Sequence, residues 1–213
     1  IDNSPLEQVT FTKFLGVFIN ENLTWSNHIQ TLLSKTSKSL GIIRKLSYTL
    51  PSPVLLSLYY TLVHPYLEYC NIAWASSHTA LLQKLLITQK KAVRIVDGKK
   101  FNTHAAPIFK KYNILTLTDI NVLQTACFLY KFANSMLPSM FNYFFTLNSD
   151  VHNHFTKQCT DIHKQQCRLQ VRLDSIKFHG PRIWNSIDLQ IRLSKSIHIF
   201  KRKYKTILLY QYI

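Results

Sequence analysis

LPSPVLLSLYYTLVHPYLEYCNIAWA, residues 50–75, is the stretch of this 213-residue chain that decides the fold. Its apolar and aromatic side chains recur at helical steps of three and four residues, so one face has to be buried. Ser52 and Pro53 are typical of a helix start, because serine caps free N–H groups and proline lacks the N–H that a first turn leaves unpaired. Pro65 removes one backbone hydrogen bond inside the pattern. We therefore predict a helix from Ser52, a break near Pro65 and a second helical piece through Trp74.

Residues 80–96, ALLQKLLITQKKAVRIV, predict another amphipathic helix, whose apolar face is interrupted by Gln89. At about 100° per residue its cations gather on one side, and they are Lys84, Lys90, Lys91 and Arg94. No acid lies among them, so they repel one another unless an anion sits opposite. A solvated surface face is the simpler interpretation of such a run. The charge of the whole chain favours the other interpretation, in which these cations bind an anion.

The chain contains 26 Lys and Arg residues but only 10 Asp and Glu residues, which gives a formal net charge of +16 and an isoelectric point near 9.8. This excess is present in both halves, so it is not a basic tail on a neutral domain. Self-repulsion of this size is typical of proteins that bind a polyanion, so nucleic acid is the expected partner and an anionic membrane surface comes second. No apolar run reaches the length of a membrane span, so we expect no membrane partner.

Further helices are predicted over residues 26–47, around 106–112, from Thr118 to about Ser135, and over 196–209. The first of these carries Lys35, Lys38 and Lys45 along one flank, and the last is expected to expose Lys201, Arg202 and Lys205. We expect the cations of the first basic helices to contact phosphates as point charges. The predicted nucleic-acid-binding residues are Lys35, Lys38, Lys84, Lys90, Lys91 and Arg94.

The fold class is predicted to be mainly α, with little strand structure. Residues 9–19 alternate and are rich in β-branched and aromatic side chains, which predicts one strand without a partner in the chain, a remnant of a sheet upstream of residue 1. Alternation over 167–177 makes that segment a candidate strand in a smaller, otherwise helical C-terminal region. We divide the chain into a residual strand (1–22), a helical domain (23–147) and a basic C-terminal region (148–213).

The four cysteines form no CxxC pair, which indicates reduced thiols and an intracellular protein. Cys159, His163 and Cys167, with His152 or His154, are the one candidate zinc set, but the close ligand pair of known zinc sites is missing and unligated loop side chains are the simpler interpretation. Trp25, Trp74 and Trp184 are expected in the core, with stacking on bases as the alternative.

Eight segments, in this order, resemble the C-terminal third of LINE-type reverse transcriptases of non-LTR retrotransposons, of the jockey kind. They are KFLGVFINENLTWSNHI (13–29), LPSPVLLSLYYTLVHPYLEYCNIAW (50–74), QKKAVRIV (89–96), the helix containing Asp119-Ile120, LPSMF (137–141), HNHFTKQ (152–158), GPRIWNSI (180–187) and FKRKYK (200–205). The resemblance implies that the first segment closes the palm and that the next helices form a thumb. Such a thumb holds the RNA template, the DNA primer or their hybrid, and the rest of the same polyprotein supplies the upstream palm and fingers.

The same resemblance implies a nuclear location and an RNA-directed DNA polymerase as the parent enzyme. Two-metal polymerisation needs paired carboxylates, and the ten acids of this chain are scattered singly, without the YxDD motif of the family. We therefore assign no catalytic residue and no metal ligand, expect no cofactor in this chain, and place the Mg²⁺ ions in the missing palm. The chain alone is predicted to be inactive as a polymerase.

A free-standing basic helical module that binds DNA or RNA, or that mediates interactions, is the alternative function, in this case derived from a mobile element. An upstream reading frame that encodes the paired aspartates would favour a fragment of a reverse transcriptase. A start codon near Ile1 would favour the free-standing module.

Overall fold

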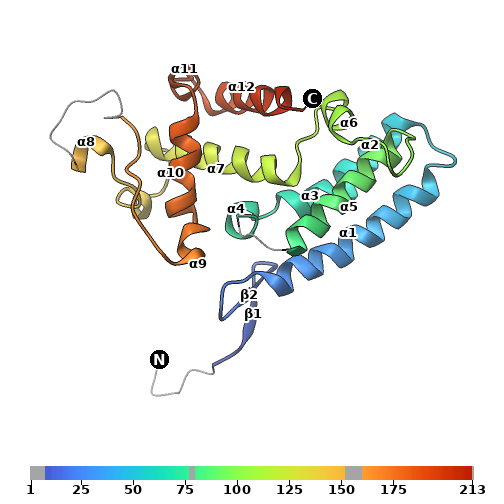
Figure 1. The fold of residues 1–213 in the computed structure, drawn as a ribbon, viewed down its shortest axis with the longest axis horizontal. Coiled ribbons are helices and arrows are strands. Elements are labelled where there is room, and N and C mark those ends of the chain that lie inside the picture. The colour runs from blue at the N-terminus through green and yellow to red at the C-terminus, as the bar shows by residue number, and fades with distance from the viewer. Residues whose placement is uncertain (1–7, 77–79, 152–159, 213) are drawn as a thin grey trace.

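The protein is mainly helical in its computed structural model, which describes residues 8–76, 80–151 and 160–212. Figure 1 shows that helices form nearly the whole body and that a short hairpin projects from it on the N-terminal side. The predicted fold class, mainly α with strand structure at the N-terminus, is confirmed.

The N-terminal strand structure is a hairpin, so the prediction of a single strand without a partner is wrong. β1 (Phe11–Phe14) pairs antiparallel with β2 (Val17–Asn20). The two residues between them, Leu15 and Gly16, have positive φ angles of 46° and 84°. Two left-handed residues in a two-residue loop have the φ signs of a type I′ turn, whose twist matches that of paired strands. The alternating stretch therefore folds back on itself.

The stretch that decides the fold forms three helices, and a long helix lies on either side of it in sequence. Their bounds are α1 (Ser26–Leu46), α2 (Ser52–Leu62), α3 (His64–Glu68), α4 (Asn71–Trp74) and α5 (Ala80–Val96). The predicted break near Pro65 is confirmed, because α2 ends before Val63 and Pro65 lies in the first turn of α3. A second break, at the left-handed Cys70, separates α3 from α4 and was not predicted.

α7 (Leu117–Ala133) is the central helix of the fold, and α6 (Ala106–Lys111) precedes it. The cap of α7 is Thr116 and not the predicted Thr118, since the Asp119 N–H donates to the Thr116 hydroxyl oxygen over 3.3 Å. α3, α4, α5, α10 and α12 pack around α7. Buried residues therefore occur nearly all round this helix, which is typical of a helix inside a core.

The described residues after α7 contain further helices. They are the 3₁₀ helix η1 (Ser139–Phe141), α8 (Asn148–Val151), α9 (Gln170–Leu173), α10 (Ile176–Ser186), α11 (Leu189–Arg192) and α12 (Ile197–Tyr210). The candidate strand over 167–177 is wrong, because α9 lies there. Leu169 and Val171, which would form the buried side of a strand, are exposed, so the alternation reflects no buried sheet face.

One hydrophobic core includes side chains from before and after residue 148. Tyr130 of α7 stacks on Phe200 of α12 with ring centroids 4.7 Å apart. Trp74 and Trp184 are buried, which confirms their expected place in the core, and Trp25 packs against it half-buried. The division at residue 148 stays a prediction. Among the described residues, none of the helices combines the length and the apolar character that crossing a bilayer requires.

Candidate nucleic-acid interface

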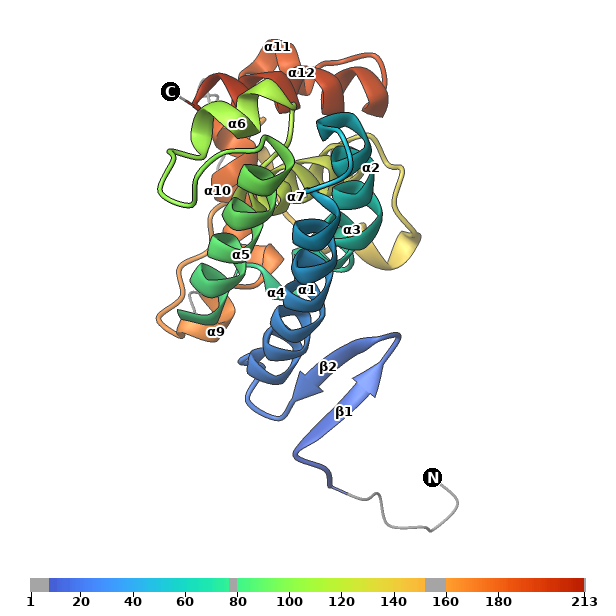
Figure 2. The same cartoon turned by 90° about the vertical axis from the view of Figure 1, so that its right-hand side faces the viewer.

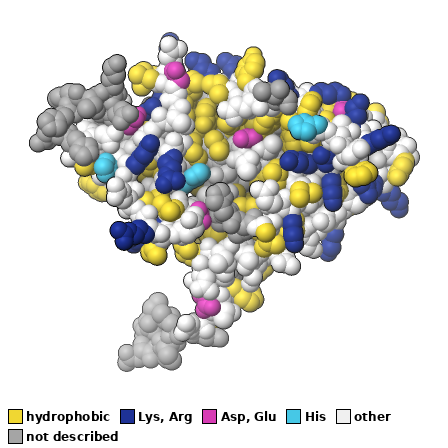
Figure 3. Space-filling view, viewed as in Figure 1, with side chains coloured by type: hydrophobic (Ala, Val, Ile, Leu, Met, Phe, Trp, Pro, Cys, Tyr) yellow, Lys and Arg dark blue, Asp and Glu magenta, His cyan; other side chains and the backbone are white. Residues whose placement is uncertain are grey.

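α1 and α5 pack side by side, and all their charged residues are basic. Their eight cations are Lys35, Lys38, Arg44 and Lys45 in α1, and Lys84, Lys90, Lys91 and Arg94 in α5. In Figure 3, Lys and Arg side chains gather over the half of the molecule that contains these helices. Two packed helices without a carboxylate create a positive potential that attracts polyanions.

The four cations of α5 differ in how far they are free to bind a ligand. Lys84 and Lys91 are exposed, whereas Lys90 and Arg94 are half-buried. The Nε of Arg94 donates to the carbonyl oxygen of Thr103 over 2.6 Å, so this side chain ties down the loop after α5. Lys84 and Lys91 are seven residues apart, which places them about two turns apart on the same side of the helix. We call these two residues the α5 flank.

The predicted cations of α1 lie on another side of the helix pair. The Nζ of Lys35 is 5.4 Å from the centroid of the Tyr66 ring in α3, and Figure 2 shows α1 between α3 and α5. Lys38 is exposed about one turn further along α1. We call Lys35 and Lys38 the α1 flank. The six predicted residues thus occupy several sides of the α1–α5 pair and do not form one patch.

Arg44 is a basic residue that was not among the predicted binding residues. It lies nine residues after Lys35, which at about 100° per residue is the opposite side of α1. There it lines a hollow together with Val96, the last residue of α5, and Lys99 from the loop that follows. Because residues 26–46 contain no acid, the sequence could have indicated that Arg44 belongs with the predicted binding residues.

Gln89 fixes the rotation of α5, although it interrupts the apolar face in the sequence. Its side chain donates to the Tyr59 hydroxyl over 3.0 Å and to the Leu115 carbonyl over 2.9 Å, and it accepts from the Leu117 N–H over 2.8 Å. These partners belong to α2, to the segment just before α7 and to the first residue of α7. Because all three bonds need one orientation of α5, they hold the α5 flank outward.

The acid that follows α5, Asp97, is already paired and does not neutralise the flank. Its carboxylate accepts hydrogen bonds from the Lys111 Nζ over 2.5 Å and from the Tyr112 hydroxyl over 2.8 Å. Burial works to raise the pKa of Asp97, but these two hydrogen bonds outweigh it and hold that pKa below its usual range. Asp97 therefore stays ionised and ties the end of α5 to α6.

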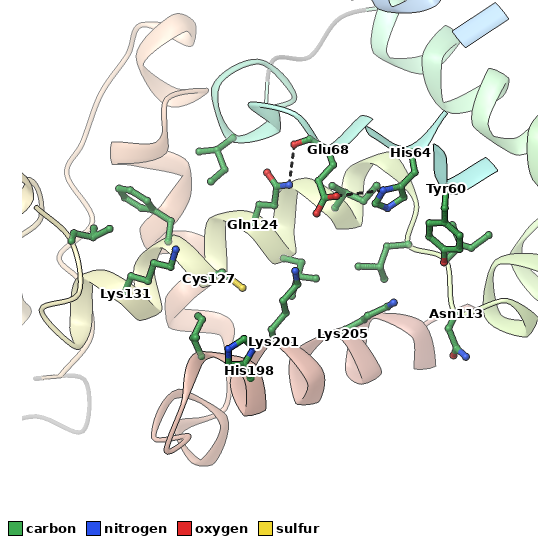
Figure 4. Close-up of a pocket in the computed structure, with 18 residues that line it drawn as sticks. Tyr60, His64, Glu68, Asn113, Gln124, Cys127, Lys131, His198, Lys201 and Lys205 are labelled. Carbon is green, nitrogen blue, oxygen red and sulfur yellow. Dashed lines mark hydrogen bonds and ion pairs between the residues drawn. The ribbon is translucent and has the colours of Figure 1, made fainter. Parts of the chain in front are cut away.

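A second basic feature, which was not predicted from the sequence, is a cleft of about 600 Å³ between α3, α7 and α12. Figure 4 shows basic side chains from two helices along it: Lys131 from α7, and His198, Lys201 and Lys205 from α12. His64 and Glu68 of α3 lie across from α12, and Tyr60 and Asn113 lie at one end. Lys205 was expected to be exposed but is half-buried here. Lys205 lies four residues after Lys201, at the edge of the apolar stripe of the helix. This spacing could have indicated that both lysines lie beside the buried face.

The environment of this cleft disfavours the positive charge of its basic side chains. Burial lowers the pKa of Lys205, and the neighbouring Lys201 lowers it further, although the charge of Glu68 acts in the opposite direction. Burial also lowers the pKa of His64, although Glu68, whose carboxylate lies 3.4 Å from the His64 Nδ1, acts in the opposite direction. Burial and the neighbouring cations disfavour positive charge here more than Glu68 favours it, so an anion in the cleft would relieve both effects.

Within the described part of the chain, no three His, Cys, Asp or Glu side chains come together as a group that could hold a metal ion. Three members of the candidate zinc set, His152, His154 and Cys159, lie outside the described residues. The Nδ1 of His163 is 3.3 Å from the side-chain oxygen of Asn148.

Comparison with known proteins gave no match to a protein-family model, to a curated protein or to a solved structure.

Proposed function

We propose that this chain binds nucleic acid through the basic surface of α1 and α5, as the thumb and C-terminal part of a LINE-type reverse transcriptase. The observation that carries the proposal is the acid-free helix pair, whose eight cations have no carboxylate on either helix to oppose them. The order of the eight sequence segments supports the choice of family. The bound species in this proposal is the RNA template, the DNA primer or their hybrid.

Binding by this surface would be mainly electrostatic. Lysine ammonium groups contact phosphates as point charges and release condensed counterions, and they carry little information about base sequence. The exposed Lys84 and Lys91 supply the main contacts, with Lys35 and Lys38 contacting a second stretch of backbone across α1. Arg94 acts indirectly, because its bond to Thr103 holds the adjoining loop in place.

The remaining parts of the proposal follow from the parent enzyme. The palm and fingers of the same polyprotein would supply the paired aspartates and bind the Mg²⁺ ions, so polymerisation would occur outside this chain. The role of the chain would be to hold the duplex in register, in the nucleus that the family resemblance implies.

A free-standing basic module is the second candidate, and the hairpin favours it. β1 and β2 satisfy each other's inner backbone groups, so the N-terminal strand does not need a sheet from upstream sequence. The outer edge of β1 and the apolar side chains of Phe11 and Phe14 are exposed, however, as they would be if a further part of a polymerase covered them.

The proposal is tested by measuring the affinity of the purified chain for a fluorescent RNA–DNA hybrid, a DNA duplex and an RNA duplex at several salt concentrations. We expect log Kd to rise steeply and linearly with log salt, and the hybrid to bind at least as tightly as either duplex. Replacing Lys35 and Lys38 by glutamine should reduce the salt slope by less than replacing Lys84 and Lys91. Affinity that does not depend on salt would contradict the proposal.

A further inference from the structure

The cleft between α3, α7 and α12 contains two lysines that form no ion pair among the described residues, and Glu68 of α3 acts on Lys205 only at longer range. Lys201 and Lys205 lie one turn apart on α12 and both line the cleft. Within the described part of the chain, neither ammonium group is at ion-pair distance from a carboxylate. Lys205 is half-buried, and a partly desolvated charge without a counter-ion in contact is unfavourable. An anion bound between the two ammonium groups would remove that cost.

The rest of the lining indicates what is attached to the anion. The floor is apolar and is formed by Ile114, Leu123 and Ile197, among others. A volume of about 600 Å³ lies in the range of sites for small organic ligands, so an inorganic ion would leave most of it unfilled. The ligand therefore combines an anionic group with an apolar body.

At the Tyr60 end of the cleft, the lining suits a ligand whose apolar body is a flat ring with polar edges better than one with an alkyl chain. The Tyr60 and His64 rings lie against each other with centroids 5.3 Å apart, and Tyr60 keeps part of its surface exposed. Asn113 lies at the same end and has both a hydrogen-bond donor and an acceptor. An aromatic face beside an amide suits a nucleobase, which stacks on rings and forms hydrogen bonds at its edge.

We propose that this cleft binds a nucleoside phosphate, with the phosphate between Lys201 and Lys205 and the base at the Tyr60 end. The same chemistry is offered by a free mononucleotide and by the phosphorylated end of a strand. The site shares no residue with the α5 flank or the α1 flank, so it can be present whether or not those flanks bind nucleic acid.

The first test is calorimetric titration of the full chain with adenosine 5′-monophosphate, adenosine and decanoate. We expect the monophosphate to bind at least about tenfold more tightly than adenosine, because the phosphate makes charge-assisted contacts, and decanoate to bind more weakly than the monophosphate. The variant Lys201→Gln/Lys205→Gln should lose about tenfold or more of the monophosphate affinity. The matched control is Arg202→Gln/Lys203→Gln, which removes the same charge from exposed positions of the same helix and should stay within about twofold of the wild type.

Three results of this titration would overturn the proposal. Equal losses in the two variants would show that only net charge matters. Equal affinity for adenosine and its monophosphate would remove the role of the lysine pair. Tighter binding of decanoate would identify the cleft as a site for an aliphatic anion.

Alkylation of Cys127 gives a second readout that does not depend on the variants. Its thiol lines the cleft, and burial raises its pKa, so the free protein should react slowly there. We expect saturating adenosine 5′-monophosphate to slow the reaction of Cys127 with iodoacetamide several-fold while the exposed Cys70 reacts as before. Unchanged reactivity of Cys127 at saturation would place the ligand elsewhere and contradict the proposal.

The two sources of the ligand are separated by titrating a 5′-phosphorylated dinucleotide into the Lys84→Gln/Lys91→Gln variant. Tighter binding than the mononucleotide identifies the end of a strand, and equal or weaker binding identifies the free nucleotide. Both outcomes support the cleft as a nucleoside phosphate site, provided that Lys201→Gln/Lys205→Gln abolishes the binding.

Discussion

The side-chain amide of Gln89 in α5 donates a hydrogen bond to the Tyr59 hydroxyl in α2 over 3.0 Å, and both side chains are fully buried. Burial raises the pKa of Tyr59 far above its usual range, although the bond from Gln89 lowers it in part. The hydroxyl therefore stays neutral at any pH at which the protein is studied. With its bonds to Leu115 and Leu117, Gln89 joins α5 to two other parts of the helical body.

Gln89→Leu is expected to lower the free energy of unfolding by about 2 to 4 kcal/mol. Leucine has a similar volume but leaves the Leu115 carbonyl and the Leu117 N–H buried without partners, and each such group costs about 1 to 3 kcal/mol. Urea denaturation measures the change. Gln83→Leu, at an exposed position of the same helix, is the control and should change the stability by less than about 0.5 kcal/mol. A decrease no larger than that of the control would mean that the buried bonds contribute little.

His28 predicts a pH dependence of stability. It is buried, its Nδ1 is 3.5 Å from the Phe18 backbone nitrogen of β2, and its ring lies edge-on to Trp74. Burial, aided by the charge of Lys35, lowers the pKa of His28 below the value of 6.5 that the unfolded chain has. The unfolded state then binds more protons as the pH falls, so the stability is complete above about pH 6.5 and declines below it, by at most about 1.4 kcal/mol per pH unit for this group.

Thermal unfolding at about pH 7.5 and 5.5 tests this assignment. His28→Gln should be less stable than the wild type at pH 7.5, but its stability should fall by less than that of the wild type when the pH is lowered to 5.5. His104→Gln, at an exposed position, should retain the decline of the wild type. If His28→Gln declines as steeply as the wild type, then other groups cause the pH dependence.

Two glycines should respond to alanine in opposite ways. Gly41 lies in the middle of α1, where a Cβ would meet no atom within 4 Å, so Gly41→Ala should stabilise the protein by about 0.5 to 1 kcal/mol.

Gly16 has a φ of 84° in the hairpin turn, where an L side chain costs about 1 to 2 kcal/mol. Gly16→Ala should therefore speed amide exchange in β1 and β2 and leave α5 protected. Slow exchange in the hairpin of this variant would mean that the turn does not determine the pairing.

The helices were predictable where periodicity and end signals agree. α5 begins and ends where its apolar stripe does, and α1, α2 and α12 begin at or next to the predicted serines. The hairpin was missed because residues 9–19 were interpreted as one alternating run, although Leu15-Gly16 divides it into two strands of four residues. The alternation over 167–177 predicted a strand that does not form, because no neighbouring strand in the described part of the chain is there to bury either face.

The candidate sites show a different limit. Helical arithmetic gathered the four cations of α5 on one side, but it could not show that Arg94 is tied to Thr103 or that α1 turns Lys35 toward α3. The cleft joins residues from α2, α3, α4, α7 and α12 that are up to about 145 positions apart in sequence, and no local pattern reports such a contact. Gln89 was interpreted as an interruption of an apolar face because its partners come from two other segments.

The salt dependence of binding to an RNA–DNA hybrid, compared between two double variants, tests the central claim most directly. Lys84→Gln/Lys91→Gln removes the α5 flank, and Arg202→Gln/Lys203→Gln removes two exposed cations of α12. Each phosphate that a variant no longer neutralises should lower the slope of log K against log salt by about 0.7 to 0.9. The slope of the first variant should therefore fall by about 1.4 to 1.8, and that of the control by much less. Equal decreases in the two variants, or a larger decrease in the control, would contradict the assignment of the α5 flank as the nucleic-acid interface.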